Sequence, residues 1–249
     1  MKQIMDVSYG TLPQQILDVY LPDGEIKSVF LYFHGGGLKA GDKMDAEIFA
    51  TYLCERGIGL ISANYRMYPD AKYPEFILDA ADAVAWSVKY VQQELSCNKL
   101  YIGGSSAGGY LTLMICFDHR YLKNVGVDPE FIAGYLHDAG MTTTHYNILR
   151  EERGLSYKRI IVDEAAPLYY VGLAENYPPM RFVTSDQDVA TRMEQTMLML
   201  STLTRFGYTG FDQVVMHGKH CAYCAEIDGD GVCVFAKMVY DFICRVEGI

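Results

Sequence analysis

Ser106 is the residue whose surroundings point most directly to chemistry. It stands at the centre of the run G-S-S-A-G at 104–108, which fits the pattern G-x-S-x-G. The run follows an apolar segment at 99–102 and opens a helical pattern at 107–118. A sharp turn between a strand and a helix needs small residues around its central serine, because that serine adopts a strained backbone conformation. We therefore predict that Ser106 projects its hydroxyl above a sheet and acts as a nucleophile in acyl transfer.

A second chemical signal is the row of three glycines at 35–37 that follows His34. Glycine has no side chain, so consecutive glycine amides can point into a cavity. Such amides, together with the amide of Ala107 directly after the nucleophile, would stabilise the oxyanion of a tetrahedral intermediate. No Gly-Lys-Ser/Thr sequence follows, which excludes a phosphate-binding P-loop. His34 precedes the glycines, so we expect it to orient their loop and not to act as a base.

A serine nucleophile also needs a general base and a group that orients this base. In hydrolases with this nucleophile turn, the chain order is serine, acid, histidine. Downstream of Ser106, Asp186 and Asp188 follow the predicted strand at 180–184. His217 and His220 follow the predicted strand at 213–216. Both pairs therefore fall at the strand ends where Ser106 lies. The spacing alone leaves the choice within each pair open.

The elements that must position these residues alternate along the chain. Short apolar and β-branched runs predict strands, and apolar residues at three- and four-residue steps predict helices. The predicted strands span 29–33, 59–63, 99–102, 132–136, 180–184 and 213–216, and the predicted helices span 45–56, 74–95, 107–118, 190–206 and 232–246. Residues 4–9 and 15–21 predict an antiparallel hairpin before them. The alternation indicates an α/β fold with a mostly parallel sheet, helices on both faces, and a site at the carboxyl ends of the strands.

The composition narrows the classes of function. The chain has 249 residues, half of them hydrophobic, and a formal net charge of -10. It is long enough for a large core, and it does not have the composition of a disordered protein. The acidic balance argues against nucleic acid as a partner, and no apolar run is long enough for a membrane span. The N-terminus has no secretory signal pattern and the seven cysteines do not resemble a disulfide framework, so we expect a cytoplasmic protein.

Taken together, the motifs resemble those of α/β-hydrolase-fold esterases of the hormone-sensitive-lipase-like kind, a group that includes small acetyl esterases and arylformamidases. The resemblance rests on H-G-G-G at 34–37, N-Y-R-M-Y-P at 64–69 and the serine turn at 104–108. These motifs occur in the family's order and cover most of the chain. The resemblance implies the α/β-hydrolase fold, with a mostly parallel central sheet, helices on both faces and a short cap insertion.

The resemblance also implies which residues form the catalytic triad: Ser106, Asp188 and His220. In the family, the acid lies three residues after a glycine-like position, which here is Ser185, and the histidine follows a short glycine-containing turn. A serine replaces the family's glycine at 185, so Asp186 stays the alternative acid.

The resemblance further implies an oxyanion hole made by the amides of Gly36, Gly37 and Ala107, with Gly35 as an alternative donor. Three tyrosines in predicted loops near the site, Tyr68, Tyr73 and Tyr223, are expected to contact the substrate. This apparatus requires no metal or organic cofactor.

A zinc site is the competing interpretation of the loop around His220. His217, His220, Cys221 and Cys224 have spacings that zinc sites use, and Cys233 lies beyond them. A structural zinc site usually has two separated pairs of ligands, whereas these four crowd into one short loop. We therefore expect no metal site and assign His220 to Ser106.

The expected activity is that of a serine carboxylesterase that hydrolyses short-chain acyl esters, such as acetyl groups on sugars, with a small-molecule ester as its partner. An arylformamidase is the alternative, because it shares the apparatus and differs in the acyl and leaving groups. A non-catalytic receptor on the same fold would lack a triad member, whereas this chain keeps His220. The sequence leaves the oligomeric state open, a homo-oligomer included.

The length is also informative about domain organisation. Strand patterns begin almost at once and His34 arrives early, which leaves no room for an N-terminal helical cap. We expect one domain, 1–249, with a small lid insertion at about 137–170, where residues 141–158 have no strand pattern. This predicts a nearly minimal hydrolase with a shallow pocket for short acyl groups.

Overall fold

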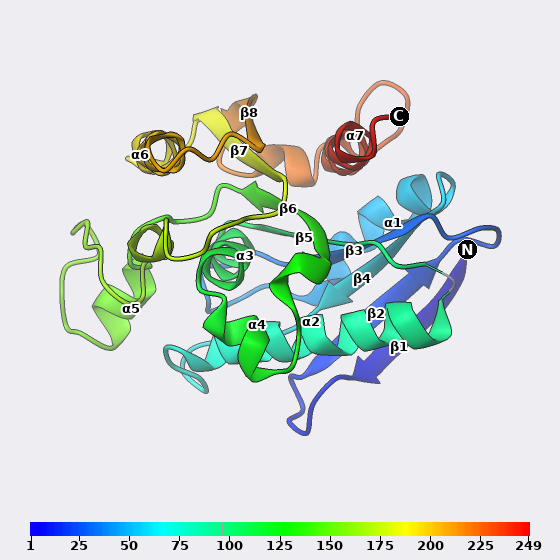
Figure 1. The fold of residues 1–249 in the computed structure, drawn as a ribbon, viewed down its shortest axis with the longest axis horizontal. Helices are drawn as coiled ribbons and strands as arrows, with labels where there is room; N and C mark the ends of the chain where they lie inside the picture. The colour runs from blue at the N-terminus through cyan, green and yellow to red at the C-terminus, as the bar shows by residue number, and fades with distance from the viewer. Residues whose placement is uncertain (96) are drawn as a thin grey trace.

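One sheet of eight strands runs through the computed structural model, which describes residues 1–95 and 97–249 (Figure 1). The order across the sheet is β1-β2-β4-β3-β5-β6-β7-β8. The strands are β1 (Lys2–Ser8), β2 (Ile16–Leu21), β3 (Ser28–Phe33), β4 (Ile58–Ala63), β5 (Leu100–Ser105), β6 (Ile132–Asp138), β7 (Met180–Gln187) and β8 (Phe211–Lys219). β2 pairs antiparallel with β1 and β4, and the remaining pairs are parallel. The predicted N-terminal hairpin and mostly parallel sheet are confirmed.

Helices cover both faces of this sheet (Figure 1). They are α1 (Glu47–Cys54), α2 (Glu75–Glu94), α3 (Ala107–Phe117), α4 (Arg120–Asn124), α5 (Tyr146–Glu151), α6 (Arg192–Arg205) and α7 (Val234–Glu247). Buried residues of α2, α3 and α6 share one hydrophobic cluster, and those of α1 and α7 share a second. The five predicted helices are present, whereas the short α4 and α5 have no counterpart in the prediction. Within the described residues, no helix combines the length and the apolar character that crossing a bilayer requires.

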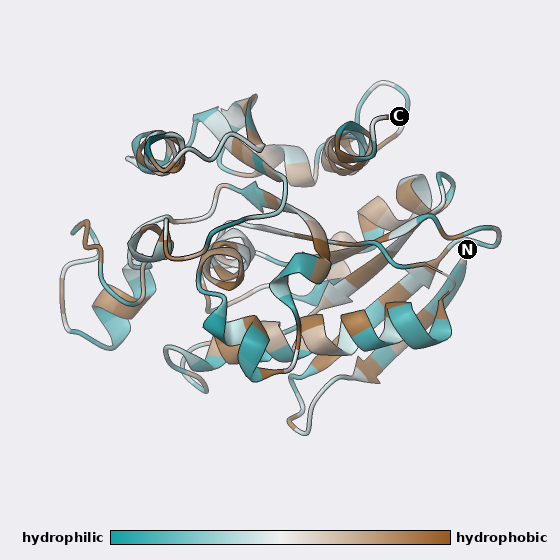
Figure 2. Cartoon of the chain, in the orientation of Figure 1, coloured by the Kyte–Doolittle hydropathy of each residue, from teal (hydrophilic) through white to brown (hydrophobic). Residues whose placement is uncertain are grey.

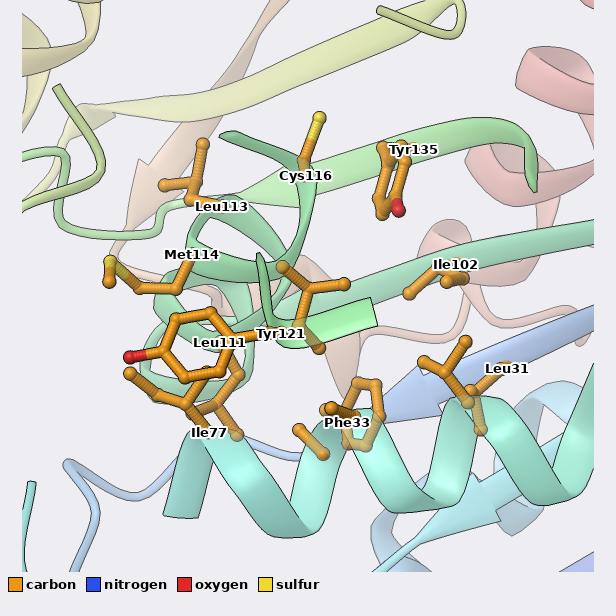
Figure 3. Packing of buried hydrophobic residues seen from close by; sticks show 14 of the residues in the cluster. Leu31, Phe33, Ile77, Ile102, Leu111, Leu113, Met114, Cys116, Tyr121 and Tyr135 are labelled. Atoms are coloured by element: carbon orange, nitrogen blue, oxygen red, sulfur yellow. The ribbon is translucent and has the colours of Figure 1, made fainter. Parts of the chain in front are cut away.

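α3 is buried along its whole length, which fixes the position of the serine turn before it. It contains no charged residue, and Figure 2 shows it mainly in the colours of apolar and neutral side chains. Leu111 and Met114 of this helix lie in one cluster with Ile77 of α2 and Phe33 of β3 (Figure 3). Burying one such side chain contributes about 1.5–3 kcal/mol to stability. The core therefore anchors the helix whose first residue follows Ser106.

The parallel strands bring distant parts of the chain to one edge of the sheet. His34, Ser106, Asp188 and His220 each directly follow the last residue of β3, β5, β7 and β8, respectively. Since parallel strands end at the same edge, the topology places these four residues together. The site thus lies at the carboxyl ends of the strands, as the α/β pattern predicts.

The connection between β6 and β7, residues 139–179, is the long insertion of the fold. It contains α5 and a 3₁₀ turn at Pro167–Tyr170. In Figure 1 the part around α5 extends away from the sheet, on the left of the view. α5 has six residues, too few to show a clear helical period in the sequence.

Candidate active site

Ser106 occupies the turn between β5 and α3 with a positive φ of 54° and a ψ of -107°. A Cβ at Gly104 would meet the backbone of Gly108, and a Cβ at Gly108 would meet the carbonyl of Phe33. The Ser106 amide donates a hydrogen bond to the Asp138 carbonyl oxygen at 2.8 Å. The glycines are therefore required by close approach of backbone, and the bond to β6 holds the serine in a conformation that few non-glycine residues adopt.

His220 connects Ser106 to Asp188. Its Nε2 lies 2.8 Å from the Ser106 hydroxyl, and its Nδ1 lies 2.6 Å from Asp188 Oδ1. An ionised carboxylate can only accept, so Nδ1 carries the proton and Nε2 is free to accept from the serine. The Asp188 carboxylate also accepts from the amides of Ser185 at 3.1 Å and Val189 at 2.7 Å. The structure thus brings the three predicted triad residues together in the order acid, base, nucleophile.

The electrostatics of this pair favour charge separation. Burial acts to lower the pKa of His220, but the interactions with Asp188 and with Cys221 together outweigh it and raise the pKa above its ordinary value. Burial acts to raise the pKa of Asp188, but the bonds from His220 and from backbone amides lower it overall. The site therefore stabilises an imidazolium beside a carboxylate, which is the state that forms when a serine gives up its proton.

The alternative acid and the alternative histidine pair with each other instead. His217 Nδ1 lies 2.7 Å from Asp186 Oδ2, and the Gly218 amide donates to Asp186 Oδ1 at 2.8 Å. The His217 side chain is 86% exposed and the Asp186 side chain 43%. The structure therefore pairs Asp188, and not Asp186, with His220.

The glycine loop after β3 lies beside Ser106. Gly36 and Gly37 have φ of 101° and 65°, in the region that favours glycine. In the described part of the chain, neither amide donates a hydrogen bond to the protein, and both residues line a cavity together with Ser106. The amide of Ala107 is the first of α3, where helical amides have no partner inside the helix. These amides are available to an oxygen of a ligand.

His34 contacts the glycine loop and the residue Tyr65 that packs against it. Its ring stacks on Tyr65, with centroids 4.5 Å apart, and its Nδ1 lies 2.8 Å from the Gly35 carbonyl. The Tyr65 hydroxyl donates to the His34 carbonyl at 2.9 Å. Burial lowers the pKa of His34, so the imidazole is neutral. These contacts fit the predicted orienting role.

A cavity of about 1160 Å³ opens beside Ser106 and His220. Its apolar and aromatic lining comes from Tyr32, Ile48, Phe49, Met141, Tyr146, Tyr157, Ile160 and Val189. Small-molecule sites usually measure about 300–1,000 Å³. The cavity is thus larger than the short-acyl pocket predicted from the sequence, because the insertion 139–179 adds walls to it. A second cavity, of about 720 Å³ and lined by His119 and Tyr177 among others, contains none of the site residues.

Asp138, Cys221 and Cys224 are the potential metal donors that the described residues bring together, with donor atoms within 4.8 Å of one another. The Tyr223 hydroxyl donates to one oxygen of Asp138, and the Cys224 thiol lies 3.3 Å from the other. Burial raises the pKa of both Asp138 and Cys224. Tyr223 and Cys224 thus already engage both oxygens of Asp138, and a metal would have to displace these bonds.

Comparisons with known proteins point to one fold. A family model described as BD-FAE matches residues 17–130, a little under half of the chain. The solved structure of esterase B from Lactobacillus rhamnosis is similar with a TM-score of 0.78, over 99% of this chain and 86% of that chain, at 16% identity. The chain has the α/β-hydrolase fold.

Two curated relatives are similar to parts of this chain. Kynurenine formamidase of Danio rerio is 31% identical over 114 residues, which are 45% of this chain and 38% of that protein. Carboxylic ester hydrolase LipN of Mycobacterium tuberculosis is 29% identical over 101 residues, which are 39% of this chain and 27% of that protein. The chain therefore matches well under half the length of these relatives.

The three tyrosines expected to contact the substrate lie outside the cavity of the α/β-hydrolase fold. Tyr68 donates to the Glu152 carboxylate, and Tyr73 donates to the Glu164 carbonyl at 2.6 Å. Tyr223 is 1% exposed and donates to Asp138. Their hydroxyls fasten segments of the protein to each other, which corrects the expectation. A position in a loop does not tell which way a side chain points.

Other lining residues of the α/β-hydrolase cavity were missed by the sequence reasoning. Arg192, at the start of α6, and the segment 157–160 of the insertion both line it. No motif marks them. The signals present in the sequence were the basic pair Lys158-Arg159 and an arginine four residues after Asp188.

Proposed function

We propose that this chain is a serine esterase that hydrolyses short acyl esters, with Ser106 as nucleophile, His220 as general base and Asp188 as the residue that orients the base. The observation that carries the proposal is the continuous hydrogen-bonded path from Asp188 through His220 to Ser106, with distances of 2.6 and 2.8 Å. The esterase among its structural neighbours supports the fold on which such chemistry occurs.

In the proposed acylation step, Ser106 Oγ attacks the carbonyl carbon while His220 Nε2 takes the hydroxyl proton. The tetrahedral intermediate collapses, the bond to the alcohol breaks, and His220 gives its proton to the leaving oxygen. Water then attacks the acyl-enzyme with His220 again as base, which releases the acid and restores Ser106. Asp188 keeps the imidazole in the required tautomer and stabilises the imidazolium.

The amides of Gly36, Gly37 and Ala107 would bind the oxyanion formed in each step. Support comes from the free Gly36 and Gly37 amides on the cavity wall and from the position of Ala107 at the start of α3. Losing one donor of this kind typically costs about 2.7–4 kcal/mol of transition-state stabilisation. The positive end of the α3 macrodipole adds to this potential.

The proposed enzyme acts as one domain, 1–249, with a small lid within about 137–170. The support is that Met141, Tyr146 and residues 157–160 line the cavity from this segment. A lid of this size would exclude water around the reacting carbonyl without forming a separate domain.

Short acyl groups, such as acetyl groups on sugars, are the proposed acyl part, and the wide cavity would then hold the alcohol part. An arylformamidase is the second candidate. It is favoured by the similarity of 45% of the chain to a kynurenine formamidase. Both reactions use the same nucleophile, base and oxyanion donors.

The test is to measure rates with 4-nitrophenyl acetate, butyrate and octanoate and with N-formylkynurenine, for the wild type and Ser106→Ala. We expect the acetate or butyrate to be the best substrate and Ser106→Ala to abolish turnover. A preference for octanoate would contradict the short-acyl proposal, and fastest turnover of N-formylkynurenine would favour the second candidate. Full activity of Ser106→Ala would refute Ser106 as the nucleophile. No product from any substrate would refute the enzyme and leave a binding function.

A further inference from the structure

The cavity beside Ser106 contains a buried arginine, Arg192, that forms no hydrogen bond or ion pair through two of its guanidinium nitrogens within the described residues. Arg192 is 5% exposed, and it lines the cavity together with Ser106 and His220. Its Nε and Nη1 atoms are buried, and within the described residues they have no hydrogen-bond partner. Burying an unpaired charge is costly, so proteins normally pair such a group. An unpaired guanidinium on the wall of a ligand cavity indicates that its partner is part of the ligand.

A second arginine of this chain shows what a structural role looks like. Arg181 is also 5% exposed, and it forms ion pairs with Asp212 at 2.7 Å and Asp241 at 2.6 Å. Burial acts to lower its pKa, but these two carboxylates outweigh burial and raise the pKa. For Arg192, burial dominates and the pKa is lowered. Two arginines of equal exposure therefore differ in whether the protein itself supplies the counter-charge.

The carboxylates close to Arg192 are engaged elsewhere. Asp188 and Asp138 both act on the guanidinium electrostatically. Asp188, however, accepts from His220 and from two backbone amides. Asp138 accepts from Tyr223 and Cys224. Neither forms an ion pair with Arg192 among the contacts of the described residues, so the guanidinium keeps its hydrogen-bonding capacity.

The other charged residues of the cavity wall are mostly cations. Lys158 and Arg159 line it from the insertion, and Asp45 is the acidic residue of the lining. Arg192 is also the first residue of α6, a helix of 14 residues whose positive macrodipole end therefore lies at this wall. In a chain with a net charge of -10, this concentration of cations at the site favours an anionic ligand.

We propose that Arg192 binds a carboxylate group of the substrate, so that the preferred esters carry a free acid in addition to the scissile bond. This inference rests on the proposed esterase function and names its substrate class. A guanidinium presents two parallel N–H donors that match a carboxylate, and such charge-assisted pairs are among the stronger hydrogen bonds. The acid would fix the substrate in the wide cavity while its ester carbonyl faces Ser106.

The experiment compares esters that differ only in this acid, with the carboxamide as the neutral counterpart. One pair places the group on the acyl side: mono-4-nitrophenyl glutarate and the 4-nitrophenyl ester of glutaric acid monoamide. The other pair places it on the alcohol side: 4-acetoxybenzoate and 4-acetoxybenzamide. Rates are corrected for uncatalysed hydrolysis. We expect kcat/KM of the wild type to favour the acid in at least one pair, by about ten- to a hundredfold.

Three variants locate the origin of that preference. Arg192→Gln removes the charge, and the acid-to-amide ratio of kcat/KM should fall to near one. Arg192→Lys keeps the charge but not the planar donors, and the ratio should fall only in part. Arg205→Gln is the matched control, since it makes the same change at an exposed residue of α6 outside the cavity lining, and it should change the ratio by less than about threefold.

The outcomes separate this inference from the esterase proposal. If the enzyme cleaves the carboxamide-bearing esters as fast as the acid-bearing esters in both pairs, the inference is overturned and the esterase proposal is left intact. An equal loss for acid and amide in Arg192→Gln would also overturn it, because Arg192 would then act through Asp188. If no member of either pair is hydrolysed, the proposed function itself fails. Should Arg192→Gln not fold, the wild-type ratios and Arg192→Lys still decide.

Discussion

Two histidine–aspartate pairs lie at the carboxyl ends of β7 and β8, and they differ mainly in depth. His217 and Asp186 meet at 2.7 Å with side chains 86% and 43% exposed. His220 and Asp188 meet at 2.6 Å with side chains 24% and 3% exposed. The two aspartates are two positions apart at the end of β7, and the two histidines are three positions apart at the end of β8. The same residue types thus form one surface pair and one enclosed pair.

The difference lies in what surrounds each pair. Water screens the exposed pair, and such pairs contribute little to stability. The enclosed pair lies in a lower dielectric, where its Coulomb interaction is stronger, and its carboxylate is fixed by the amides of Ser185 and Val189. Only the enclosed pair has a third member, because His220 reaches Ser106 at 2.8 Å. The histidine–aspartate contact itself is alike in the two pairs, so burial and the contact with Ser106 are what distinguish the enclosed pair.

The largest expected contrast is between the two histidines. His220→Ala removes the proposed base and should lower kcat with 4-nitrophenyl acetate by about 10⁴-fold or more. His217→Ala should change kcat by less than about twofold, since its side chain touches neither Ser106 nor the cavity lining. Initial rates and circular dichroism of the two folded variants measure this directly. Comparable losses in both variants would mean that the surface pair also takes part in the reaction.

The two aspartates give the next contrast. Asp188→Asn should lower kcat by about 10³- to 10⁴-fold, because the amide no longer enforces the tautomer with the proton on Nδ1 or stabilises the imidazolium. Asp186→Asn is the matched control, since it makes the same chemical change two residues from Asp188 in a carboxylate that pairs with His217, and it should cost less than about twofold. Nearly wild-type activity of Asp188→Asn would show that His220 works without an orienting acid.

Both pairs illustrate how much the sequence can predict. The period of apolar residues predicts the strands, and strand ends determine the edge at which His34, Ser106 and His220 meet, because parallel strands end together. The requirement for small residues at 104 and 108 is local and steric, so the motif reveals it. The residues alone did not decide between Asp186 and Asp188. That choice depends on which carboxylate faces inward, and the family resemblance supplied it.

The remaining parts of the site depend on long-range packing. Tyr68, Tyr73 and Tyr223 lie in loops near the site, yet their hydroxyls bind Glu152, Glu164 and Asp138 across long sequence separations. Arg192 is distinctive because its buried Nε and Nη1 have no hydrogen-bond partner among the residues that the structure describes, which is a property of its surroundings. No sequence pattern shows that a side chain lacks a hydrogen-bond partner, so only the structure reveals the role of Arg192 in the cavity wall.

The pH dependence of activity is a finer test of the comparison. Because Asp188 raises the pKa of His220, the acid limb of kcat/KM should have its midpoint above the ordinary imidazole value of 6.5. Asp186→Asn should leave this midpoint in place. In Asp188→Asn, NMR titration of the His220 imidazole should show a lower pKa than in the wild type. A midpoint that follows Asp186 would reverse the assignment of the acid.

The smallest expected effect is on stability, where the sign follows from the two shifts. The folded-state pKa of Asp188 is lowered, so its contribution is present above its unfolded pKa, near 4, and is lost as the pH falls through the folded value. The folded-state pKa of His220 is raised, so its contribution is present below an unfolded pKa near 6.5 and is lost as the pH rises through the folded value.

The enclosed pair should therefore stabilise the protein most between about pH 4 and 6.5. In that window Asp188→Asn should lower Tm by about 2–8 °C relative to the wild type, and the difference should shrink at higher pH as His220 loses its proton. Asp186→Asn should shift Tm by less than about 1 °C at every pH, because its pair is exposed. Thermal melts from pH 3 to 10 measure both. A Tm difference for Asp188→Asn that grows above pH 7 would mean that Asp188 stabilises the fold through a cation other than His220, and the unpaired Arg192 beside it would be the first to examine.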